Sequence, residues 1–84
     1  MTGKTYSWTE TTTGYVMSVN GINRWFIKET EREGMDNRFE VYEIVQQPSG
    51  CILRDVRFSL TDAKYRAYLI EVETRNSRYA MILV

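Results

Sequence analysis

Residues 15–28 read YVMSVNGINRWFIK, and this stretch decides the fold. The dipeptide Asn20-Gly21 stands between two runs rich in β-branched and aromatic residues. Both of its residues accept the positive φ that a type I′ hairpin turn requires. The sequence therefore predicts a β-hairpin that runs from Tyr15 to Lys28.

A two-residue turn also predicts which side chains share a face of this hairpin. The face that we expect to join the core carries the pairs Val19–Ile22, Met17–Arg24 and Tyr15–Phe26. The opposite face carries the pairs Ser18–Asn23, Val16–Trp25 and Gly14–Ile27. Trp25 is thus expected on the face away from the core.

Further strands are predicted on both sides of the hairpin. Residues 6–11 alternate in character and favour an edge strand, whereas residues 29–37 are polar with a central glycine and favour a loop. Residues 38–45 and 51–58 are rich in β-prone side chains and flank the turn around Pro48. Together these segments predict an antiparallel β-meander of about four to five strands.

A helix is expected to follow the meander. Ser59 can cap its N-terminus, and Asp62 is an acid in its first turn. We expect the helix to run to about Arg75, with an apolar stripe made of Leu60, Ala63, Ala67, Ile70 and Thr74. An alternative is that residues 68–74 form a strand, because they are also β-prone.

The last six residues, 79–84, are apolar at every position and predict a final C-terminal strand, paired inside the sheet or across a homodimer. The predicted fold class is therefore α+β: the meander, one amphipathic helix near the C-terminus and that last strand.

Composition limits the function. The 84 residues suit a single domain spanning 1–84, and eleven basic residues balance eleven acidic ones. This balance disfavours a general nucleic-acid binder, which is usually strongly basic. The chain has one cysteine, and its N-terminus has no signal-like apolar run. It also has no apolar stretch near the roughly 20 residues that span a bilayer. These features predict a soluble, cytoplasmic protein with no membrane partner.

Catalysis is not expected. The chain has no histidine, which removes the commonest general base and metal ligand and the partner of serine and cysteine nucleophiles. Without an imidazole nearby, Cys51 reads as a buried structural thiol. The carboxylates do not follow a metal-loop spacing, so we predict no enzyme, no metal site and no cofactor.

Two surfaces are candidates for binding a protein. The helix carries a second apolar stripe that one sheet face cannot cover, made of Tyr65, Tyr68, Leu69 and Val72. The polar loop carries three alternating carboxylates that could meet a basic partner, Glu29, Glu31 and Glu33.

The sequence thus favours a non-enzymatic protein-protein interaction module that blocks a partner's surface. Small motif-free α+β domains are common among phage and mobile-element proteins, including anti-CRISPR inhibitors of host defence, and on that base rate alone we extend the prediction to such an inhibitor. The alternative is a DNA- or RNA-binding accessory protein that uses the sheet face, through Arg24, Trp25, Arg54 and Arg57.

Overall fold

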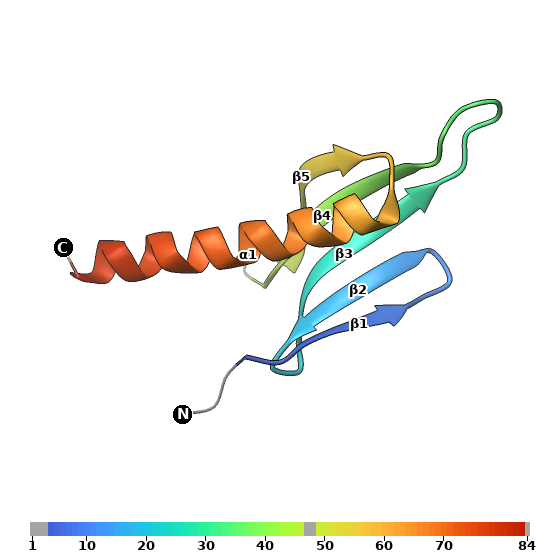
Figure 1. The fold of residues 1–84 in the computed structure, drawn as a ribbon. Coiled ribbons are helices and arrows are strands. Elements are labelled where there is room, and N and C mark those ends of the chain that lie inside the picture. The colour runs from blue at the N-terminus through green and yellow to red at the C-terminus, as the bar shows by residue number, and fades with distance from the viewer. Residues whose placement is uncertain (1–3, 47–48, 84) are drawn as a thin grey trace.

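The strands form an uninterrupted antiparallel meander with a helix at its end (Figure 1). The computed structural model describes residues 4–46 and 49–83, with side chains up to Glu73. The elements are β1 (Tyr6–Glu10), β2 (Gly14–Val19), β3 (Ile22–Thr30), β4 (Arg38–Gln46), β5 (Ser49–Arg57) and α1 (Leu60–Leu83). Their five-stranded sheet has the order β1-β2-β3-β4-β5. The predicted α+β class is confirmed.

The hairpin turn between β2 and β3 is the one predicted from the sequence. Asn20 and Gly21 have φ values of 52° and 82°, in the left-handed region that a type I′ turn requires. The two pairs nearest the turn, Val19–Ile22 and Ser18–Asn23, also have the predicted register.

Beyond those two pairs the register of the hairpin differs from the prediction, because Met17 pairs with Trp25. Arg24 is the extra residue of a β-bulge, and all residues of β3 after it change face. Trp25 and Ile27 therefore lie in the core in place of the predicted Phe26. The prediction that put Trp25 on the face away from the core is wrong for this reason.

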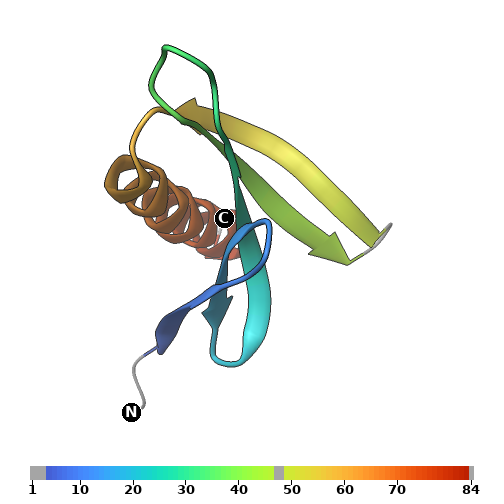
Figure 2. The same ribbon diagram turned by 90° about the vertical axis from the view of Figure 1, so that its right-hand side faces the viewer.

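A second bulge interrupts the ladder between β4 and β5. Val41 pairs with Asp55 and Tyr42 pairs with Leu53, so that Arg54 has no cross-strand partner. Bulges increase the local right-handed twist of a sheet. In Figure 2 the β4–β5 hairpin accordingly points away from the β1–β2 hairpin.

The core lies between α1 and one side of the sheet (Figure 2). We call this the helix side and the opposite one the outer side. The helix contributes Ala63, Ala67 and Ile70, three residues of the predicted apolar stripe, and the alanines let its backbone approach the sheet. The sheet contributes Met17, Val19, Trp25, Ile27, Phe39 and Val41.

The N-terminus of α1 is capped as predicted. The backbone N–H of Asp62 donates to Ser59 Oγ at 3.1 Å, and the N–H of Ala63 donates to the Ser59 carbonyl oxygen at 3.0 Å. A serine in this position satisfies N–H groups that have no partner inside the helix.

The C-terminus of α1 lies further along the chain than predicted. The helix continues to Leu83 rather than ending near Arg75. The predicted strand at 79–84 and the alternative strand at 68–74 are therefore both wrong. Of the predicted strand, Val84 alone lies outside the described residues. No glycine or proline interrupts residues 60–83, and each added residue extends the helix at low cost once its first turn exists. The helix consequently projects beyond the sheet (Figure 1).

Candidate functional site

A cluster of opposite charges lies between α1 and the sheet. Two glutamates form its centre, Glu43 of β4 and Glu71 of α1, which are only 6% and 3% exposed. Glu71 Oε1 accepts hydrogen bonds from Arg24 Nε at 3.0 Å and from the Trp25 indole N–H at 2.9 Å. Glu43 forms ion pairs with Arg24 and Arg54, the two bulge residues. We call these five residues the buried charge cluster.

This cluster accounts for three of the four residues of the nucleic-acid hypothesis. Trp25 is 1% exposed, so its ring is not available to stack on a base. Arg24 and Arg54 are ion-paired with the buried carboxylates. The fourth residue, Arg57, pairs with Asp55 at 2.9 Å. All four residues lie on the helix side, and the three arginines among them pair with carboxylates of the same chain.

Asp55 joins β5 to the helix. Its carboxylate accepts hydrogen bonds from Arg66 Nε of α1 at 2.8 Å, from Arg57 and from the Val56 backbone N–H. Burial raises the pKa of the Asp55 carboxyl, but the Val56 N–H and the two guanidinium groups lower it by more. The pKa of Asp55 therefore lies below its ordinary value of 3.8.

This lowered pKa predicts a pH dependence of stability. A carboxylate whose pKa is lower in the folded state stabilises the fold above its unfolded-state pKa, and this contribution is lost as the pH falls through the folded-state value. We expect the free energy of unfolding to fall on acidification from about pH 5. In Asp55→Asn this fall should be smaller, as measured by urea unfolding at a series of pH values. Asp36→Asn, in an exposed loop, is the matched control, and a profile of Asp55→Asn equal to that of the wild type would contradict the assignment.

The second helical stripe is only partly open. Tyr65 is 62% exposed and Tyr68 is 40% exposed, whereas Leu69 and Val72 are half-buried. The ring of Tyr68 meets the ring of Tyr6 of β1 edge to face, with centroids 5.1 Å apart. The N-terminal strand therefore covers part of the stripe.

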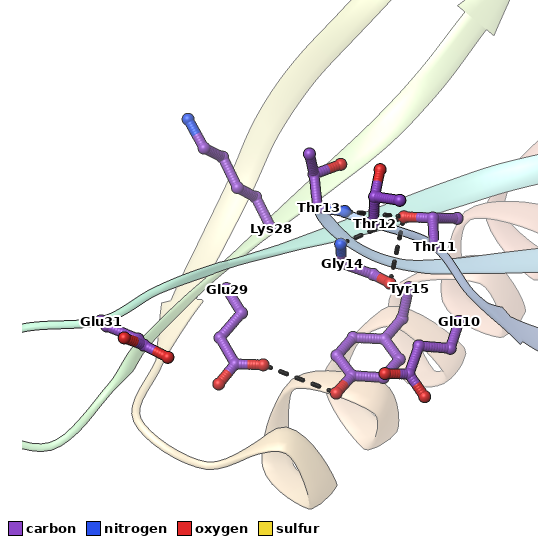
Figure 3. Close-up of a pocket in the computed structure, with 9 residues that line it drawn as sticks. All are labelled: Glu10, Thr11, Thr12, Thr13, Gly14, Tyr15, Lys28, Glu29 and Glu31. Carbon is purple, nitrogen blue, oxygen red and sulfur yellow. Dashed lines mark hydrogen bonds between the residues drawn. The ribbon is translucent and has the colours of Figure 1, made fainter.

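The three predicted loop carboxylates occupy different places. Glu29 and Glu31 line a cleft of about 400 Å³ between the β1–β2 turn and the end of β3 (Figure 3), whereas Glu33 is exposed and is not among the residues that line it. Sequence reasoning missed the third carboxylate of the cleft, Glu10, and the threonines of the turn beside it. The triplet 11–13 before Gly14 was the available signal for that turn.

The side chains around this cleft hold one another in place. Thr11 Oγ1 accepts a hydrogen bond from the Gly14 N–H at 3.1 Å, which fixes the turn. Glu29 accepts a hydrogen bond from the Asn37 amide at 2.7 Å and lies 3.5 Å from the Tyr15 hydroxyl. Burial, followed by the charges of Glu29 and Glu10, raises the pKa of Tyr15 above its ordinary value of 10.0.

The start of β5 is open on both sides of the sheet. We call residues Ser49–Leu53 the β5 arm; all five are exposed. Ile52, which pairs with Glu43, lies on the helix side and is 49% exposed, while Leu53, which pairs with Tyr42, lies on the outer side and is 47% exposed. Cys51 directly precedes Ile52, pairs with Ile44 and is also exposed. The prediction of Cys51 as a buried thiol is therefore wrong, because Cys51 lies on the outer side of the sheet, which α1 does not cover.

No family model, curated protein or solved structure matches the chain. The function must therefore be inferred from the chain itself. Among the described residues, no group of three or more cysteine, aspartate or glutamate side chains is arranged to hold a metal ion, and no helix is long and apolar enough to cross a membrane.

Proposed function

We propose that the chain is a non-enzymatic protein-binding module and that its contact surface is the β5 arm. The observation that carries this proposal is a strand at the edge of the sheet whose apolar side chains are exposed on both sides. An edge strand presents backbone N–H and C=O groups that can pair with a strand from another chain. Ile52 and Leu53 would then contact the partner on the two sides of the extended sheet.

The chemistry of the arm supports strand addition as the mode of binding. Main-chain hydrogen bonds provide affinity in this mode, and alternate side chains provide specificity. Residues 49–53 include no charged side chain and no proline, the two commonest devices that keep an edge strand unpaired. Binding alone is sufficient to block a partner's surface, which is how the inhibitor predicted from the sequence would act.

The proposal is tested by placing a charge on the arm. We expect Ile52→Lys to reduce the retention of a protein partner from an extract of the producing cells by about tenfold or more, because a lysine at an edge strand opposes pairing. Ile22→Lys is the matched control, since Ile22 lies beside the β2–β3 turn and is 60% exposed. Bound protein is quantified by mass spectrometry for wild type and both variants.

A second measurement shows whether the retained protein covers the arm. The thiol of Cys51 is exposed in the middle of the arm, so its rate of alkylation should fall when the retained protein is added back in pure form. Equal retention by all three proteins, or alkylation that is unchanged by the bound protein, would contradict the proposal.

A further inference from the structure

The two edges of the sheet differ in their protection against pairing. At one edge, β1 has only five residues, and Glu10 is charged. At the other edge, β5 has nine residues, of which the first five carry no charge while Arg54, Asp55 and Arg57 follow them. The bulge at Arg54 also interrupts regular pairing at that point. Regular strand addition is therefore confined to the β5 arm.

The arm is complementary to a second copy of itself. If two arms lie antiparallel about a two-fold axis at Cys51, then Gly50 of one copy lies opposite Ile52 of the other, and Ser49 lies opposite Leu53. Nothing lies within 4 Å of the position where Gly50 would carry a side chain, so the exposed Ile52 of the other copy can pack there. No like charges oppose one another in this pairing, and the formal net charge of the chain is zero.

This arrangement also closes the assembly. A two-fold interface uses the same surface in both copies, so no arm remains free to add a further chain. A contact between β5 of one copy and β1 of the next would instead leave β1 unpaired at one end and a β5 arm unpaired at the other, so the assembly could extend without limit. A two-fold axis perpendicular to the sheet would also place both α1 helices on the same side of the joined sheet.

We propose that the chain forms a homodimer in which the β5 arms of two copies pair antiparallel and join the two sheets into one. This proposal rests on the proposed function, because it names the partner of the same arm. The occupant is a second copy of this chain rather than a peptide from another protein. The uncharged arm, the fit of Ile52 to Gly50 and the closed symmetry favour that choice.

The test is the mass of the purified full chain in solution, measured by sedimentation equilibrium over a range of concentrations. We expect the wild type and Ile22→Lys to dimerise with the same dissociation constant, and Ile52→Lys to dimerise about tenfold or more weakly. Cys51 alkylation should slow as the wild-type concentration rises, and far-ultraviolet circular dichroism should show that both variants remain folded.

The possible results separate this proposal from the broader one. A wild-type chain that stays monomeric, or a dimer equally strong in Ile52→Lys, would overturn the homodimer. If the chain is monomeric but a different protein is retained by the wild type and lost by Ile52→Lys, the homodimer fails while the binding function stands. If the chain is monomeric and no retained protein depends on Ile52, both proposals fail.

Discussion

Replacing Glu71 with alanine is expected to lower the free energy of unfolding by about 3 kcal/mol or more, because it removes the buried carboxylate from an ion pair. Arg24 Nε and the Trp25 indole N–H both donate to Glu71 Oε1, and both would lose their acceptor. Buried donors without a partner retain their full desolvation penalty. A chain of this size has limited stability to lose. The change is measured by urea unfolding monitored by circular dichroism.

Glu73→Ala provides the matched control for this experiment. Glu73 lies two residues further along the same helix and is exposed, so its replacement should change stability by no more than about 0.5 kcal/mol. Glu71→Gln should cost less than Glu71→Ala, since an amide oxygen in place of Oε1 can still accept both hydrogen bonds and only the negative charge is lost. If Glu71→Ala and Glu73→Ala proved equally stable, the buried charge cluster would not hold the helix to the sheet.

Gly14→Ala is expected to destabilise the chain by about 3 kcal/mol. A methyl group on Gly14 would overlap the backbone carbonyl oxygen of Ile27 on the neighbouring strand. Because that oxygen belongs to the main chain of β3, relief requires β2 and β3 to separate. The same shift would disturb the turn that Thr11 fixes through its hydrogen bond to the Gly14 N–H.

Gly50→Ala is the corresponding control, because no atom lies within 4 Å of its added methyl group. At protein concentrations low enough for wild type and variant to be monomeric, its unfolding free energy should stay within about 0.5 kcal/mol of the wild type. Both variants are compared by the midpoint and slope of urea unfolding. An effect of Gly14→Ala no larger than that of Gly50→Ala would mean that β2 and β3 do not approach as closely as described.

The meander and the helix cap were predictable because local sequence determines them. Asn20-Gly21 specifies its turn through the positive φ that both residues accept. Ser59 caps α1 by accepting a hydrogen bond from the N–H of Asp62, only three residues further along the chain. The strands could be predicted from the alternation of apolar and polar side chains. These parts of the fold depend on neighbours in the chain, so a single sequence contains the information.

The bulge at Arg24 could not be predicted in the same way, because its partner Glu71 is distant in the chain. Arg24 and Trp25 meet Glu71, a residue 47 and 46 positions away, so an arginine on a predicted core face gave no indication of its acceptor. The acidic cleft is a similar case, since Glu10 and Glu29 are far apart in the sequence and line the same cleft only in the folded chain. The end of α1 was missed because the apolar segment 79–83 suits a strand as well as a helix.

The unbroken strand order has a consequence for how the chain folds. Each strand pairs with the strand next to it in the sequence, so the sheet can grow one hairpin at a time, and closing each short loop costs little entropy. The contacts of Glu71 with Arg24 and Trp25 instead close a long loop. The entropy cost of that loop is smallest after the sheet has formed, so docking of α1 belongs late in the pathway. The bulge at Arg24 then becomes fixed together with the helix, because Glu71 of α1 accepts the hydrogen bond from Arg24 Nε.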